Sequence, residues 1–146
     1  MAEKVVFDTN IRLAAVLWRG AAYKCWLAAR AGLVELVYCR EMITEFSEQL
    51  SVKFGFSVDQ VRAAVHEFRR FGQEVAITGT LHVVDSDPDD DIFIECALVA
   101  GAPIIVSGDR HLLELSGYQH IRILTPGMFL TWLRDPASLE EARKDE

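Results

Sequence analysis

Short, continuously apolar runs alternate along the chain with longer segments whose apolar residues recur at helical spacing. The runs have no alternating polar face, which is typical of parallel strands covered on both sides. They lie at residues 5–7, 33–38, 104–106 and 121–124, with two weaker runs at 75–77 and 82–84. This pattern predicts an α/β fold: a three-layer α/β/α sandwich around a central, mainly parallel sheet.

Helices are predicted between these strands. Ser57 is a favourable N-cap, Gly101 a favourable C-cap, and Pro126 suits the first turn of a last helix. No internal repeat or linker interrupts the pattern, so we expect one domain over residues 1–135 and a charged, frayed tail over 136–146. The predicted helices are 21–31, 40–53, 57–71, 90–100, 110–115 and 126–133.

Composition agrees with a single folded domain, because 146 residues with 51% apolar content can bury one substantial core. The N-terminal segment reaches Asp8 after three apolar residues, which excludes a signal-peptide core. The longest apolar stretch, residues 93–106, is interrupted by Glu95, Gly101 and Pro103 and is too short to span a membrane. We therefore expect a cytoplasmic protein with no membrane partner.

Charge and cysteine content limit which metal ligands and which binding partners the chain can have. The three cysteines, Cys25, Cys39 and Cys96, lack the paired spacing of a zinc site, so we expect buried free thiols. The net charge of −7 counts against broad attraction to nucleic acid, which depends on contacts to phosphate. Any metal here is more readily held by oxygen than by sulfur or imidazole.

Two predicted strands run directly into aspartates, Asp8 and Asp109. In open α/β sheets, ligand sites form beyond the carboxyl ends of the strands, so these carboxylates meet if the strands are neighbours. Two further elements can add acids to that edge. They are the helix bearing Glu45 and the acidic run at Asp89, Asp90 and Asp91.

Clustered carboxylates repel one another unless a cation offsets their charge. Hard oxygen ligands in this number select Mg²⁺ or Mn²⁺, and such ions promote hydrolysis of phosphodiesters. Structural explanations compete with this one. Asp89 can cap a helix whose dipole favours Asp90 and Asp91, and Glu45 can be a solvated helix acid.

Four motifs occur in an order that resembles the PIN-domain family, in particular the VapC-like branch of toxins from toxin–antitoxin pairs. They are Val-Val-Phe-Asp8-Thr9-Asn10, Arg-Glu-Met-Ile-Thr-Glu45-Phe, Asp-Pro-Asp-Asp-Asp-Ile-Phe-Ile-Glu-Cys-Ala and Val-Ser-Gly-Asp109-Arg-His-Leu-Leu. The resemblance implies a divalent-metal-dependent endoribonuclease. Its acidic set would be Asp8, Glu45, Asp90 or Asp91, and Asp109.

The resemblance also carries supporting residues and partners. Asn10 and Ser107 match positions that support the metal site, and spacing back from Gly101 favours Asp90 over Asp91, although both are retained. His111 stands where many relatives have a further aspartate. Implied partners are an RNA substrate, a cognate antitoxin protein and a second copy of the chain in a homodimer.

Two other functions stay open. A PIN-like module that has lost catalysis would bind protein or nucleic acid, and a phosphohydrolase would use Asp8 as nucleophile, although Asn10 replaces the second aspartate it needs. Glu95 either supplements the metal site or is a buried, water-bridged residue. Basic residues near the motifs do not by themselves define an RNA-binding surface. They are Arg12, Arg19, Lys24, Arg40 and Arg110.

Overall fold

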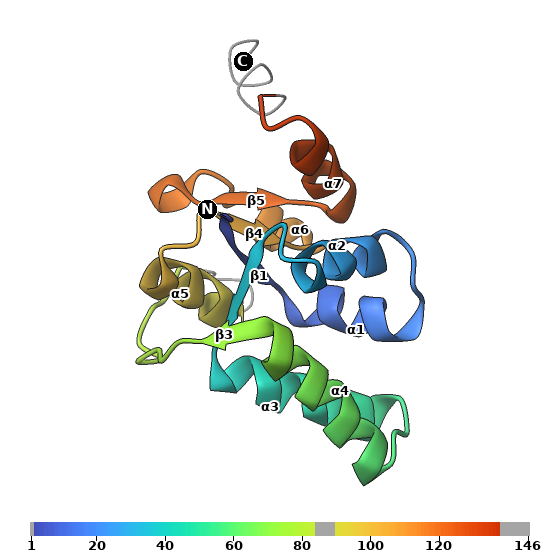
Figure 1. Cartoon of the computed structure of the whole chain (residues 1–146). Helices are drawn as coiled ribbons and strands as arrows, with labels where there is room; N and C mark the ends of the chain where they lie inside the picture. The colour runs from blue at the N-terminus through green and yellow to red at the C-terminus, as the bar shows by residue number, and fades with distance from the viewer. Residues whose placement is uncertain (1, 84–89, 138–146) are drawn as a thin grey trace.

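A computed structural model describes residues 2–83 and 90–137, which form a three-layer α/β/α sandwich (Figure 1). Within these residues five short strands make one all-parallel sheet, in the spatial order β3-β2-β1-β4-β5. The strand β1 therefore lies at the centre, between β2 and β4. The strands are β1 (Lys4–Phe7), β2 (Glu35–Tyr38), β3 (Gly72–Glu74), β4 (Ile104–Val106) and β5 (Arg122–Leu124).

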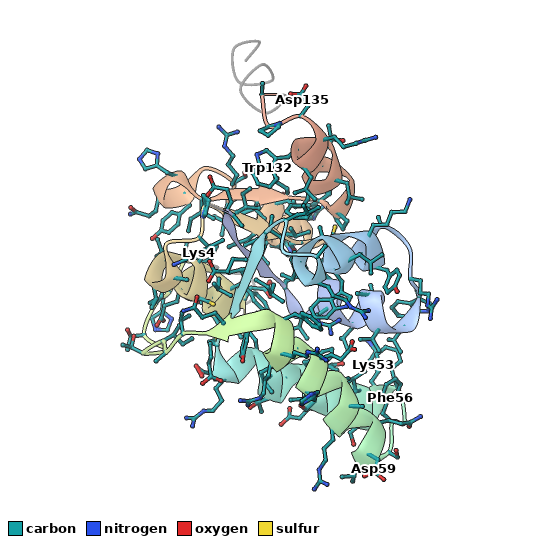
Figure 2. The ribbon with its side chains drawn as sticks, viewed as in Figure 1. Lys4, Lys53, Phe56, Asp59, Trp132 and Asp135 are labelled. Carbon is teal, nitrogen blue, oxygen red and sulfur yellow. The ribbon has the colours of Figure 1, made fainter. Side chains whose placement is uncertain are left out.

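Helices cover both faces of the sheet, and side chains fill the space between the layers (Figures 1 and 2). The helices α1, α2 and α7 lie on one side and α5 on the other, while α3 and α4 pack together beyond the sheet. No helix in the described ranges is long and apolar enough to cross a membrane. The helices are α1 (Thr9–Leu17), α2 (Ala21–Arg30), α3 (Arg40–Glu48), η1 (Gln49–Lys53), α4 (Val58–Phe71), α5 (Asp91–Ala100), α6 (Arg110–Leu113), η3 (Tyr118–His120) and α7 (Pro126–Arg134).

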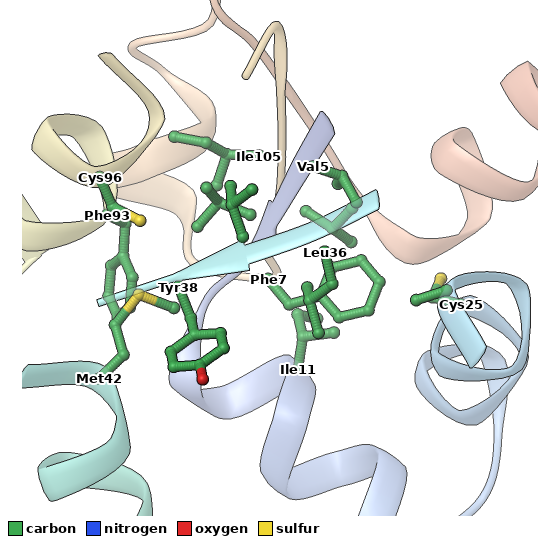
Figure 3. Close-up of a cluster of buried hydrophobic side chains, with 14 of the residues drawn as sticks. Val5, Phe7, Ile11, Cys25, Leu36, Tyr38, Met42, Phe93, Cys96 and Ile105 are labelled. Atoms are coloured by element: carbon green, nitrogen blue, oxygen red, sulfur yellow. The ribbon is translucent and has the colours of Figure 1, made fainter. Parts of the chain in front are cut away.

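The hydrophobic core fixes the position of the central strand (Figure 3). The side chains of Val5, Val6 and Phe7 are fully buried. Phe7 packs edge-on against Phe129 of α7, with ring centroids 6.0 Å apart. On the opposite side of the sheet, Phe93 of α5 is buried. A shift of β1 by one residue would turn each of its side chains to the opposite face of the sheet, and Phe7 would lose its contact with Phe129.

The register of β1 against β4 brings two distant parts of the chain together. Phe7 pairs with Val106, and the backbone N–H of Asp8 donates to the carbonyl of Val106 at 3.0 Å. The two strands therefore end in step, so that Asp8 and Ser107 lie side by side beyond the carboxyl edge. This is the arrangement that the apolar runs before Asp8 and Asp109 predicted.

The observed sheet and most of the observed helices match the elements predicted from the sequence, but three of the predicted elements differ from the structure. The strand expected at residues 75–77 lies earlier, at Gly72–Glu74, because β2 ends at Tyr38 and offers no partner farther along. Residues 82 and 83 lie outside the sheet, since the N–H of Val83 is used by the side chain of Asp91; residue 84 lies outside the described residues. The predicted helix 40–53 divides into α3 and a π-helical turn.

The helix α1 was not predicted. Two of its polar residues, Thr9 and Arg12, are buried, so its polar and apolar positions do not divide into an exposed and a buried face. Asp8 provides the helix with an N-cap instead. The predicted tail over 136–146 lies outside the described residues, except for the exposed Pro136 and Ala137.

Gly72 marks the tightest backbone contact at the edge of the sheet. An added Cβ would lie 2.8 Å from the ring of Tyr38 and 3.0 Å from the carbonyl of Phe68. We expect Gly72→Ala to lower the free energy of unfolding by about 1–3 kcal/mol through overpacking. The matched control is Gly127→Ala, which enters open space in a helix and should raise stability by up to about 1 kcal/mol. Urea denaturation of both variants tests the difference, and equal effects would contradict it.

Candidate functional site

Asp8 is a buried carboxylate at the centre of the sheet's carboxyl edge. Its side chain is 3% exposed and lies directly after β1. One oxygen, Oδ1, accepts the backbone N–H of Ile11 at 2.8 Å and so caps α1. The other, Oδ2, accepts the hydroxyl of Ser107. Both oxygens are therefore held in place by neighbouring groups.

Burial raises the pKa of Asp8 from 3.8 to about 6. The hydrogen bonds from Ser107 and Ile11 act in the opposite direction, because they stabilise the ionised form. The negative charge of Asp109 adds to the upward shift. The two carboxylates are thus close enough to repel each other.

Ser107 connects the two aspartates. Its hydroxyl donates to Asp8 and accepts the backbone N–H of Asp109 at 2.9 Å. The side chain of Asp109 in turn accepts the N–H of His111 at 2.8 Å, which caps α6. Ser107 is fully buried, so this hydroxyl is a fixed bridge between the two acids.

The two central aspartates have different surroundings at the start of α5. Asp91 accepts the N–H of Val83 at 2.8 Å, and its second oxygen lies 3.9 Å from Nδ1 of His82. It therefore holds the preceding loop against the helix. Asp90 is the N-terminal flanking residue of α5 and is also buried. Asp89 lies outside the described residues.

The remaining predicted site residues lie on separate elements. Glu45 is half-buried on α3, next to the fully buried Phe46, and Asn10 is exposed in the first turn of α1. The hydroxyl of Ser107 joins Asp8 and Asp109 by hydrogen bonds. Within the described ranges, no group of three or more His, Cys, Asp or Glu side chains is placed to hold a metal ion.

The donor chemistry nevertheless fits a hard divalent cation. Asp8 and Asp109 present carboxylates at one edge, and a buried carboxylate with a raised pKa gains most from a neighbouring positive charge. Sulfur ligands do not compete, because the three cysteines are buried free thiols, as predicted.

Comparison with known proteins settles the family. A family model described as PIN domain matches residues 4–111, which include β1, Asp8 and the Ser107–Asp109 pair. The chain belongs to the PIN-domain family. PIN domains are generally nucleases that use divalent metal ions. No protein of curated function gives a significant sequence match.

A solved structure shares the fold of this PIN domain. It is a chain of VapBC2 from Rickettsia felis, crystallised bound to a DNA fragment from the promoter. The match has a TM-score of 0.59 and 12% sequence identity, and it covers 84% of this chain and 98% of that one. At this identity the likeness concerns the fold alone.

Glu95 is buried, as one of its two predicted roles required, and binds backbone amides directly. Its carboxylate accepts the N–H groups of Thr78 at 2.6 Å, Gly79 at 3.1 Å and Leu81 at 3.3 Å. Burial by itself would raise the pKa of Glu95, but these hydrogen bonds outweigh it and the pKa is lowered. The side chain organises the loop before α5 through backbone amides, without a bridging water.

Arg12 is also not a surface residue of the PIN domain. Its guanidinium is 2% exposed and lies 3.7 Å from the ring centroid of Trp26, with Phe68 at 5.1 Å and Phe46 at 5.4 Å. Burial lowers its pKa from 12.5 to about 10, and the charge of Glu67 partly opposes the shift. Arg12 therefore packs α1 against α2, α3 and α4, and it is unavailable to RNA.

The raised pKa of Asp8 predicts that the metal-free protein loses stability as pH rises. The folded state holds the Asp8 proton more tightly than the unfolded chain, so this stabilisation is full below pH 3.8 and is lost as pH rises through about 6. The difference corresponds to about 3 kcal/mol. Asp8→Asn removes the titration and should become more stable than the wild type as pH increases, which chemical denaturation in EDTA at about pH 4.5 and pH 7 measures.

The control for this experiment is Asp59→Asn, an exposed acid in the first turn of α4. Its pH profile should run parallel to that of the wild type. Parallel profiles for wild type and Asp8→Asn would contradict the raised pKa.

Proposed function

We propose that this PIN domain is a divalent-metal-dependent endoribonuclease that hydrolyses RNA phosphodiester bonds. The observation that supports this most directly is the pair of carboxylates, Asp8 and Asp109, joined through Ser107 at the carboxyl edge of the sheet. Nuclease activity is the general property of the family, and RNA as substrate is part of the proposal.

The proposed metal ligands are Asp8, Glu45, Asp90 and Asp109, with Asn10 and Ser107 in support, and the cation is Mg²⁺ or Mn²⁺. When bound, it would activate water and stabilise the charge that develops on the leaving oxygen. Asp8 contributes a carboxylate whose orientation is fixed by Ile11 and Ser107. Ser107 also fixes the backbone of Asp109, so one hydroxyl aligns both acids.

Asp90 is the preferred central ligand, with Asp91 as the alternative. The Oδ1 atom of Asp91 already accepts a backbone N–H from Val83, and this bond anchors the loop before α5. Its Oδ2 atom lies 3.9 Å from Nδ1 of His82, so both carboxylate oxygens of Asp91 face residues that precede α5. Asp90 directly precedes the helix and is buried there, at the position that spacing back from Gly101 favours.

We further propose that the chain is the toxin of a toxin–antitoxin pair. The support is the shared fold with a chain of the VapBC2 complex, together with the sequence motifs around Asp8 and Asp109. A cognate antitoxin, a homodimer and a cytoplasmic location belong to this proposal. Expression of wild type should arrest growth while Asp8→Asn should not, and co-expressed antitoxin should relieve the arrest.

Removing either carboxylate of the central pair should abolish cleavage. We expect Asp8→Asn and Asp109→Asn to lower the rate of Mn²⁺-dependent cleavage of a mixed RNA pool by about 100-fold or more, because each removes a charged ligand. Titration calorimetry with Mn²⁺ measures metal binding on the same samples, and Asp59→Asn is the control.

Each outcome has a definite meaning. Loss of both binding and cleavage supports the metal site. Normal cleavage by both variants would exclude it, and metal binding by a wild type that cleaves no RNA would favour a PIN-like binding module. A phosphoryl group trapped on Asp8 would instead indicate a phosphohydrolase.

Substitution of Asp90 and substitution of Asp91 should have different effects on metal binding and on stability. We expect Asp90→Asn to weaken Mn²⁺ binding about 10-fold or more, and Asp91→Asn to change it much less while lowering thermal stability through the loop. Calorimetry and thermal unfolding of the two variants measure these effects. The reverse pattern would assign the ligand to Asp91.

A further inference from the structure

Acidic residues are absent from one part of this acidic chain. The protein has 22 Asp and Glu residues and a net charge of −7, yet residues 9–34 contain none. The same segment contains four cations, of which only Arg12 is buried. Residues 49–58, which include Lys53, also contain no acid, since the first acid after Glu48 is Asp59.

The structure brings these two segments together at the end of α1. Trp18, the C-cap of α1, packs edge-on against Phe54, with ring centroids 5.9 Å apart. Nζ of Lys53 lies 5.7 Å from the Phe54 ring, and the guanidinium of Arg19 lies 5.4 Å from the ring of Tyr23. We call these five residues the aromatic–basic surface. Figure 2 labels Lys53, the last residue of η1.

Folding alone does not account for this surface. The Trp18 side chain is 66% exposed, although an indole gains much from burial. The next residue, Arg19, has a φ of +62°, a left-handed conformation that costs a non-glycine residue about 1 kcal/mol or more. This turn leaves Trp18 and Arg19 both exposed at the end of the helix.

We propose that the aromatic–basic surface binds single-stranded RNA a few nucleotides away from the bond that is cleaved. Trp18 and Phe54 would stack on bases, while Arg19 and Lys53 would contact phosphates, the combination by which proteins hold single strands. This proposal adds a substrate-binding surface to the proposed nuclease, and it rests on that function because the bound RNA is taken to be the strand that is cleaved. The acid-free segments 9–34 and 49–58 favour an anionic partner, and the exposed ring of Trp18 favours one that carries bases to stack on it.

Two elements connect this surface to the acidic edge. Trp18 follows Asp8 by ten residues, which along a helix corresponds to about 15 Å. Lys53 likewise follows Glu45 along α3 and η1. At about 3.4 Å per stacked nucleotide, the gap from Asp8 spans about four nucleotides. An RNA strand bound at both places would therefore run along α1.

The test measures RNA binding without metal. A fluorescent single-stranded RNA of mixed sequence, about twelve nucleotides long, is titrated with protein in EDTA at low salt, and anisotropy is recorded. We expect Trp18→Ala/Lys53→Glu to bind about 10-fold or more weakly than wild type, because a stacked base and a phosphate contact are lost. The slope of log affinity against log salt should fall by about 0.7 for each lost phosphate contact.

Matched variants control for folding and for charge. Val58→Ala/Arg62→Glu makes the same two kinds of change at exposed positions of α4 and should bind like wild type. Trp18→Tyr keeps an aromatic ring and should retain most of the affinity. With Mn²⁺ present, the Trp18→Ala/Lys53→Glu variant should cleave with a raised KM and an unchanged kcat.

The outcomes separate this proposal from the nuclease function. If the wild type binds RNA through this surface but never cleaves it, the result supports the RNA-binding surface and excludes the nuclease function. Cleavage with unchanged affinity and KM in the double variant would overturn the surface, as would a wild type that does not bind the RNA. Sedimentation of the same samples measures the oligomeric state. If the double variant loses a dimer that the wild type forms, while its RNA affinity is unchanged, the surface is an interface between copies of the chain and the RNA proposal is overturned.

Discussion

The burial of one carboxylate, that of Asp8, constrains the rest of the site. The strand β1 lies at the centre of the sheet with all of its apolar side chains buried, so it cannot slip to bring Asp8 out into solvent. Burial disfavours the charge and raises the pKa of Asp8 to about 6. The amide of Ile11 and the hydroxyl of Ser107 offset part of this penalty. The position of Asp109 follows, because Ser107 also binds its backbone.

The fixed position of Asp8 also fixes the start of the helix α1, which Asp8 caps. It begins at the Asp8 cap, passes through Arg12 and ends at Trp18. The guanidinium of Arg12 packs on aromatic rings from α2, α3 and α4, and a desolvated cation over such rings contributes roughly 2 kcal/mol. Arg12 thereby holds α1 against the helix that carries Glu45. A cation near the Asp8 motif in sequence therefore stabilises the scaffold from a buried position.

Acidic residues are unevenly distributed along this PIN domain. The acids at the start of α5 divide their roles, since Asp91 and Glu95 bind backbone amides of the loop before the helix. The exposed cations of the α1 and α2 region face no acid on their own segment. Net charge is a property of the whole chain, whereas a nucleic acid responds to the charge at the surface it meets. The value of −7 thus carries less weight against RNA than it did for the sequence alone.

Local patterns in the sequence determined the sheet, most helices and the two aspartates that follow β1 and β4. Buried runs, caps and strand ends are encoded within a few residues, so reasoning from them placed Ile104–Val106 correctly and put Asp8 and Asp109 at one edge. Only the tertiary structure decided the features that depend on distant neighbours. Ser107 meets Asp8 across 99 positions, Glu95 meets Thr78 across 17, and Arg12 is buried by three other helices. The position of β3 also depended on where β2 ends, because a strand needs a partner and a sequence pattern does not specify one.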